Sequence, residues 1–130
     1  MGKPAAKQGD MVTATDIHIV LIPSPAGSVP TPLPHPFVGT LSGDLSSDVR
    51  VMGQWVATVG STAQNQPPHI PQGGSFQRPP SNRGQILVGS ATVRVNGRPA
   101  ARTGDTVMTC ADPVDAPNGS IVAVGTVNFG

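Results

Sequence analysis

The three histidines and the single cysteine are the residues of this chain with the most distinctive chemistry. They are His18, His35, His69 and Cys110. Imidazole nitrogens and a thiolate sulfur are the donors that a zinc ion takes in structural sites, and four of them complete its tetrahedral coordination. Because no position is left for water, such an ion would stabilise the fold and would not activate a nucleophile. The inventory therefore predicts one structural metal site.

The spacing of these residues is not that of a zinc finger, because 16, 33 and 40 residues lie between successive members of the set. Each member also has an ordinary interpretation. His18 would be a core histidine of an apolar strand, and Cys110 a small buried side chain. His35 and His69 would be solvent-facing loop residues near prolines. A Cys and His pair could also serve as nucleophile and base, but no nucleophile elbow or phosphate-binding loop accompanies them.

An eight-residue unit that occurs three times favours the metal site over these alternatives. Arg98–Asp105 reads Arg-Pro-Ala-Ala-Arg-Thr-Gly-Asp, and Lys3–Asp10 reads Lys-Pro-Ala-Ala-Lys-Gln-Gly-Asp. Gln54–Ser61 is a divergent copy that reads Gln-Trp-Val-Ala-Thr-Val-Gly-Ser. A unit repeated in so short a chain indicates a repeat architecture.

One candidate ligand follows each copy of the unit. His18 and His69 each lie eight residues after the end of a copy, and Cys110 lies five residues after the third. His35 comes from the long loop of the first repeat. If a threefold axis relates the repeats, these positions converge on the axis, where a metal could join the loops.

The chain between the candidate ligands predicts strands. Val93–Arg98 alternates around Asn-Gly, which is a strong hairpin signal, and Val49–Val59 has the same shape around Met-Gly. No stretch shows a sustained helical period. Ser24–Pro36 is so rich in proline that we expect an extended loop. The fold class is therefore all-β, with each repeat an outgoing strand, a Pro-rich or polar loop and a returning strand.

We expect a single domain over residues 1–130, with repeats over approximately 3–52, 53–97 and 98–130. The phase of the repeats predicts that the two ends of the chain pair with each other, with Val124–Asn128 against Pro4–Lys7. A net charge of +1 without blocks of like charge gives no case for nucleic acid or an anionic membrane as partner. No apolar run approaches a membrane span or a signal core, so we expect cytoplasmic synthesis and no stable membrane insertion. We also expect a monomer when free.

The doubled Pro-Ala-Ala-Lys and Pro-Ala-Ala-Arg, each followed by Gly-Asp, resemble the motif of the PAAR-repeat proteins. This resemblance implies a small conical β fold that caps a trimeric, VgrG-like spike protein of a type VI secretion system or a related contractile injection particle, one tip per trimer. It implies a metal, zinc or iron, near the point, with His18, His35, His69 and Cys110 as ligands. It also implies a mechanical role in puncturing the target envelope without enzymatic activity, export as part of the apparatus, and effectors as further partners.

Two functions of other classes stay open on the residues alone. A small metal-dependent hydrolase on a β scaffold would need an exchangeable water on the metal and a nearby carboxylate base. A Pro-rich adaptor would be recognised in extended form through Pro67-Pro68 or Pro79-Pro80.

Overall fold

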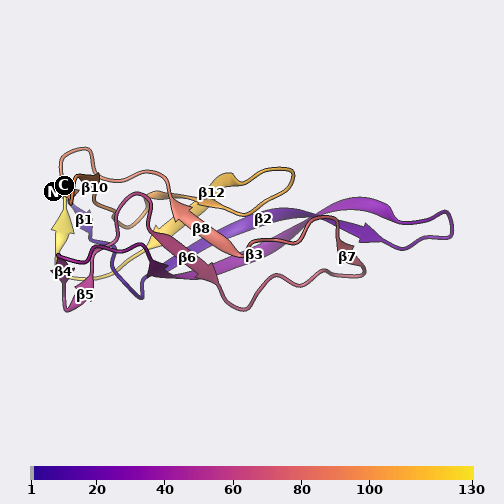
Figure 1. The fold of residues 1–130 in the computed structure, drawn as a ribbon, viewed down its shortest axis with the longest axis horizontal. Coiled ribbons are helices and arrows are strands. Elements are labelled where there is room, and N and C mark those ends of the chain that lie inside the picture. The colour runs from indigo at the N-terminus through magenta and orange to yellow at the C-terminus, as the bar shows by residue number, and fades with distance from the viewer. Residues whose placement is uncertain (1) are drawn as a thin grey trace.

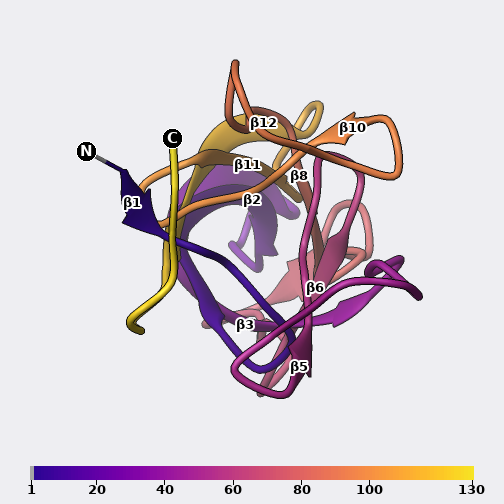
Figure 2. The ribbon, with the colours of Figure 1, turned by 90° about the vertical axis from the view of Figure 1, so that its left-hand side faces the viewer.

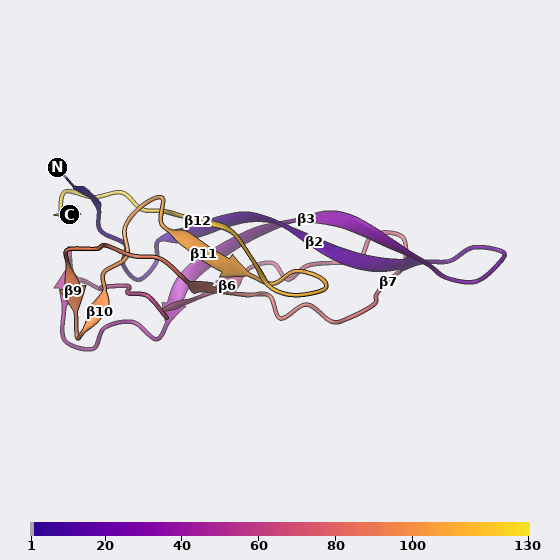
Figure 3. The same ribbon diagram turned by 90° about the horizontal axis from the view of Figure 1, so that it is seen from above.

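The protein is an elongated all-β molecule that tapers from a wide end to a single projecting hairpin (Figure 1). A computed structural model describes residues 2–130. Both termini lie at the wide end, as Figures 1 and 3 show. In the described part of the chain, no helix is long and apolar enough to cross a membrane. The predicted fold class, a small conical all-β fold, is confirmed.

Six strands of the main sheet form a closed ring in the order β2, β3, β6, β8, β11 and β12, with β12 returning to β2. A short strand, β7, pairs with β2 further along its length. The strands of this sheet are β2 (Met11–Ile22), β3 (Val29–Gly43), β6 (Thr62–Asn65), β7 (Ser75–Phe76), β8 (Arg83–Ile86), β11 (Thr106–Thr109) and β12 (Ala116–Val122). The ring encloses the main core, whose largest buried side chains include Phe37, Leu41, Ile86 and Ile121.

Three short strand pairs form the wide end. They are β1 (Lys3–Pro4) with β13 (Asn128–Phe129), β4 (Arg50–Val51) with β5 (Gln54–Trp55), and β9 (Arg94–Val95) with β10 (Arg98–Pro99). Seen along the long axis, β1, β5 and β10 lie around a common centre (Figure 2). We call this end, formed by the three pairs, the base.

Two of these pairs are the hairpins that the sequence predicts. Their turns are Met52-Gly53 and Asn96-Gly97, with φ of 52° and 80° in the first and 55° and 81° in the second. Positive φ at both central residues is the type I′ geometry that matches the twist of the flanking strands. The prediction that these two turns are equivalent is confirmed.

The third pair joins the two ends of the chain. Pro4 lies opposite Asn128, and the Ala5 N–H donates to the Val127 carbonyl over 2.9 Å. The predicted pairing of the termini is therefore confirmed, and it places β1 and β13 where the other two repeats have a continuous hairpin.

Backbone hydrogen bonds join the three copies of the repeated unit into a ring. The Ala6 N–H donates to the Ala101 carbonyl, that of Ala101 to Ala57, and that of Ala57 to Ala6, each over 3.0 Å. All three alanines are fully buried. Figure 2 looks along the direction about which the copies are arranged. Since each backbone approaches the next closely at this point, a side chain larger than a methyl group has no room.

The end of each copy is the same tight turn. In each, a side-chain oxygen accepts the N–H of the residue three positions earlier, which explains why Gly-Asp recurs and why Ser can replace Asp. The pairs are Lys7 with Asp10 at 3.0 Å, Thr58 with Ser61 at 3.0 Å and Arg102 with Asp105 at 2.8 Å. The glycine before each acceptor has a positive φ, which a glycine adopts without strain.

The Pro-rich segment of the first repeat differs from the prediction. Ser24–Pro36 was expected to be a loop, but β3 begins at Val29 and pairs with β2 without interruption from Val29 to Thr40. Prolines occupy alternate positions of β3, so every missing N–H lies on the side away from β2, and the ladder stays intact. The result is a long β2–β3 hairpin that projects from the closed sheet (Figure 3).

We predict that Ala101→Leu lowers the free energy of unfolding by about 1–3 kcal/mol, because the added methylenes overpack the alanine ring. Urea unfolding followed by the fluorescence of Trp55 measures this loss. Ala26→Leu, in the exposed turn of the long hairpin, is the matched control and should leave stability unchanged. An Ala101→Leu protein as stable as the control would contradict the constraint.

Candidate metal centre

Four side chains meet where the closed sheet gives way to the long hairpin. Asp16, His18, His69 and Cys110 each offer one ligand atom, and these atoms all lie within 4.8 Å of one another. Asp16 and His18 are two residues apart in β2 and therefore project from the same face of the strand. Cys110 follows β11 directly, and His69 lies in the loop between β6 and β7.

The three histidine rings form a triangle. The ring centroids of His18 and His69 are 5.0 Å apart, and that of His35 is 5.5 Å from each of them. The structure thus brings together three of the four predicted ligands in one compact group and places His35 directly beside it. His35 as the fourth ligand stays a prediction.

Two imidazole nitrogens of this cluster are buried without a hydrogen bond among residues 2–130. They are His18 Nδ1, which lies 3.6 Å from Asp112 Oδ2, and His35 Nε2. The Nδ1 of His35 lies 2.9 Å from the Leu33 carbonyl, which can only accept, so Nδ1 carries the proton. The lone pair of His35 is therefore on Nε2, the nitrogen without a partner. A buried, unpaired lone pair is unfavourable unless a ligand satisfies it, and a metal ion would do so.

Asp16 is the member of the cluster that the metal prediction missed. Its carboxylate is fully buried and accepts from His69 Nε2 at 2.9 Å and from the Thr109 hydroxyl at 2.5 Å. The Cys110 Sγ lies 3.5 Å from it. Its position two residues before His18 was the available signal, because that spacing on a strand places both side chains on one face.

Burial controls the protonation of the cluster. Desolvation raises the pKa of the Cys110 thiol to about 11, and the neighbouring charge of Asp16 acts in the same direction. Desolvation lowers the pKa of His18, and the adjacent His69 lowers it further. Phe76 of β7 lies over the cluster, with its ring centroid 5.7 Å from that of His18 and 5.4 Å from that of His35. The cluster is thus shielded from water on the side of the projecting hairpin.

A side pocket of about 230 Å³ borders the cluster and is lined by both His35 and His69. Its other walls include the apolar side chains of Pro36, Val38 and Ile70. A buried metal site needs a path by which the ion enters, and this pocket supplies one at the edge of the two imidazoles.

Comparison with known proteins identifies the family. The model of the PAAR motif matches residues 77–129, which include the third copy of the unit. Residues 77–129 therefore carry the PAAR motif, and the match supports a PAAR-repeat protein. The two copies outside the match have the same backbone hydrogen bonds, since Ala6 and Ala57 are bonded to one another and to Ala101 in the same way. No curated protein matches the chain.

The donors present fit the metal that the family implies. Imidazoles, a thiolate and a carboxylate suit a first-row divalent ion, and the cluster holds two unsatisfied imidazole nitrogens. His18, His69 and Cys110, with Asp16 or His35, would hold the ion. When bound, it would supply a cross-link between β2, the β6–β7 loop and the end of β11.

We predict that Zn²⁺ binding releases about one proton per ion at pH 7, because the buried Cys110 thiol must lose its proton to ligate. His18 contributes none, since its lowered pKa keeps it neutral at this pH. Below the thiol pKa of about 11, affinity should rise about tenfold per pH unit. Calorimetry in buffers of different ionisation enthalpy measures the release. Cys110→Ser should abolish it; an equal release from that variant would contradict the assignment.

We further predict that Asp16→Asn weakens metal retention by about 10–100-fold, because Asp16 holds the His69 imidazole in place or ligates directly. Competition with a chromophoric chelator measures the affinity. Asp115→Asn, an exposed position on the loop after Cys110, is the matched control. Unchanged retention in Asp16→Asn would remove Asp16 from the site.

Proposed function

We propose that this PAAR-repeat protein is the tip of a contractile injection or type VI secretion apparatus, where it caps a trimeric β-helical spike. The observation that carries the proposal is the base. Three strand pairs surround one axis, and equivalent hydrogen bonds join Ala6, Ala57 and Ala101 about it. A monomer with this pseudosymmetry can present one repeat to each subunit of a true trimer, which gives one tip per spike.

The base offers the chemistry that such a partner needs. Met52 at the β4–β5 turn is 54% exposed, and Val124 and Val127 beside β13 are also exposed. Short strands at this end leave backbone groups to which strands of the spike can add. Exposed apolar side chains among free strand edges suit an end-on interface with a β-helix.

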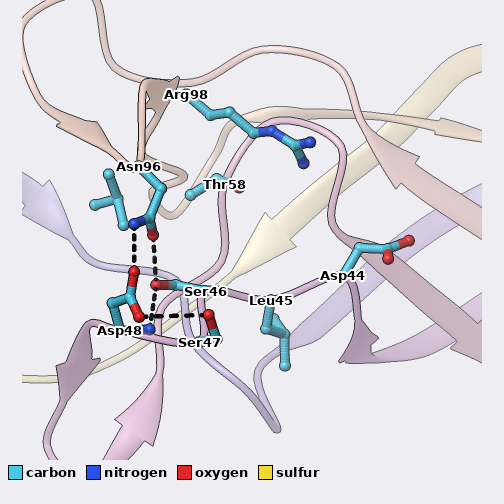
Figure 4. A pocket seen from close by; sticks show the side chains of 9 residues that line it. Asp44, Leu45, Ser46, Ser47, Asp48, Thr58, Asn96 and Arg98 are labelled. Atoms are coloured by element: carbon cyan, nitrogen blue, oxygen red, sulfur yellow. Dashed lines mark hydrogen bonds between the residues drawn. The ribbon is translucent and has the colours of Figure 1, made fainter.

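A groove on the side of the base adds a polar element to this interface. It has a volume of about 380 Å³ and lies between the loop 44–48 and the β9–β10 hairpin (Figure 4). Asn96 holds its floor together, donating to Asp48 over 2.7 Å and accepting from the Ser46 hydroxyl over 2.9 Å. Asp44 and Arg98 line the same groove and place both signs of charge within reach of a partner. In the proposed complex, polar side chains of one spike subunit occupy it and fix the rotation of the tip.

A structural metal is consistent with this role. Asp16, His18 and Cys110 are each at most 2% exposed, and four protein donors would leave no open position on the ion for a substrate that entered the side pocket. We propose Zn²⁺ as the resident ion, with His18, His35, His69 and Cys110 as ligands, and no enzymatic activity. The metal would join loops that have few apolar side chains, and it would thereby help the tip resist deformation during contraction.

We expect the protein to co-elute with a trimeric spike protein encoded beside it at one chain per trimer. Met52→Asp should weaken that complex about tenfold or more by placing a charge in the apolar part of the base. Residue 52 has a φ of 52°, a conformation that Asp tolerates well, so the variant should fold. Size-exclusion chromatography with light scattering and surface-bound trimer measure stoichiometry and affinity.

Ala26→Asp, at the opposite end of the molecule, is the control and should bind the spike as the natural protein does. The proposal is wrong if the folded protein does not bind the trimer, or if Ala26→Asp disrupts the complex and Met52→Asp does not.

A further inference from the structure

Beyond the metal centre the molecule continues as the hairpin of residues 19–32, which we call the arm. The last segment to pair with it is β7, opposite Val20 and Leu21. Beyond that point the arm projects past every other described segment (Figures 1 and 3). The metal implied by the family was expected near the point of the cone. The structure instead places the cluster behind the arm, so that the arm is the leading end of the molecule.

The arm carries no formal charge. Residues 17–43 contain no Asp, Glu, Lys or Arg, although the chain has 15 such residues elsewhere, 8 basic and 7 acidic. The tip of the arm consists of Pro, Ala, Gly, Ser and Val, and it is largely exposed. Val29 at the first position of the returning strand is 49% exposed. A projecting segment without charge is unusual, because protein surfaces depend on charge for solubility.

The outer edge of β3 lacks backbone donors along the arm. Pro30, Pro32, Pro34 and Pro36 face Leu21, Ile19, Ile17 and Thr15 across the ladder. Proline has no N–H, so these positions cannot donate to β2 and must be the outward-facing members of the strand. The next residue of the same parity confirms the direction, because the Val38 N–H points outward and donates to Asn65 Oδ1 over 2.9 Å. From Pro30 to Pro36 the free edge therefore presents carbonyl oxygens and no N–H.

The other edge of the hairpin is covered closer to the metal centre. The Ile19 N–H donates to Asp112 Oδ2 over 2.9 Å, and the Ile19 carbonyl accepts from the Gln77 N–H over 2.9 Å. Leu21 pairs with Ser75. Outward-facing donors are thus satisfied by the protein on one edge and removed by proline on the other.

These features exclude some partners and fit one. A protein strand that added to β3 would find no donors, and a partner bound through charge would find none on the arm. In the hydrocarbon of a bilayer, by contrast, each unpaired backbone N–H or C=O group and each charge is unfavourable. The arm has neither charge nor outward N–H groups, but the carbonyl oxygens on the free edge of β3 need water, so the arm suits the boundary between headgroups and acyl chains. We propose that the arm inserts reversibly into the headgroup–acyl boundary of the target bilayer as an uncharged, donor-poor hairpin whose lipid contact is independent of anionic headgroups. This rests on the proposed function, which would orient the arm towards the target membrane.

The isolated protein allows a direct test, since its single Trp55 lies at the base, far from the arm. An Ala26→Trp protein in which Trp55→Phe removes the natural fluorophore reports only on the tip. Mixed with phosphatidylcholine vesicles that have brominated acyl chains, it should show a blue-shifted emission and at least about twofold quenching, equally at low and high salt. Trp55 of the natural protein should not be quenched under the same conditions.

Charge in the arm should abolish the effect. Adding Ser28→Asp and Val29→Asp to the Ala26→Trp reporter should weaken partition about tenfold or more. Val114→Asp, at an apolar position outside the arm that is 68% exposed against 49% for Val29, is the control and should leave partition unchanged. Pro32→Thr restores one outward N–H and should weaken partition to a smaller extent.

The inference is overturned if the tip tryptophan is not quenched, if Trp55 is quenched equally, or if partition survives the two charges. It is also overturned if quenching requires anionic lipid and disappears at high salt, or if the arm instead mediates a dimer that Ser28→Asp abolishes. These measurements contain no spike protein. Failure to bind a spike would therefore leave the lipid result standing, and failure to bind lipid would leave the cap proposal standing.

Discussion

The ring of three backbone hydrogen bonds among Ala6, Ala57 and Ala101 is the constraint on which the rest of the structure depends. Aromatic residues make up only 3% of the chain, so large side chains cannot supply most of its cohesion. Backbone bonds that close on themselves can, provided that the side chains at the axis are methyl groups. The Pro-Ala-Ala unit meets this condition, and the Gly-Asp or Gly-Ser turn after it directs each chain segment away from the axis into the closed sheet.

The two ends of the molecule are stabilised differently as a consequence. At the base, the strand pairs are held together by backbone pairing about the axis and by a small apolar cluster, whose members are Ala5, Val51, Val56, Val95 and Ala100. Beyond the main core, towards the projecting hairpin, the loops contain prolines and polar residues and supply few apolar side chains. There the buried cluster of imidazoles, thiol and carboxylate occupies the interior. An ion would satisfy the imidazole nitrogens that lack a hydrogen bond there, and the Cys110 thiol, whose pKa is raised by burial, would lose its proton on ligation.

The first repeat differs from the other two at the end of the molecule opposite the base, which is the end that would face the proposed target. Its returning strand is much longer than the corresponding strands of the other two repeats, and its prolines all fall on one edge. The base has the approximate threefold symmetry that a trimeric partner would require, whereas the opposite end consists of one hairpin and has no such symmetry. In the proposed role, the symmetric end binds the spike and the asymmetric end meets the target.

The sequence by itself determined the features that are local or repeated. Asn-Gly and Met-Gly fixed two hairpins, because few residues adopt positive φ at two successive positions. The phase of the three copies predicted that the termini pair and that His18, His69 and Cys110 come together. Asp16 was not predicted as part of the metal site, since a carboxylate on a strand is usually solvated and only the closed sheet buries this one.

Only the tertiary structure decided what the Pro-rich segment does. Proline usually interrupts a strand because it removes a ladder hydrogen bond, and the sequence therefore favoured a loop between Ser24 and Pro36. The missing N–H groups of the prolines weaken the sheet only where a neighbouring strand would accept hydrogen bonds from them. Since β6 pairs with β3 only from Gly39 onwards, no strand lies against the outer edge at the prolines, and an apparent loop becomes the longest strand among the described residues.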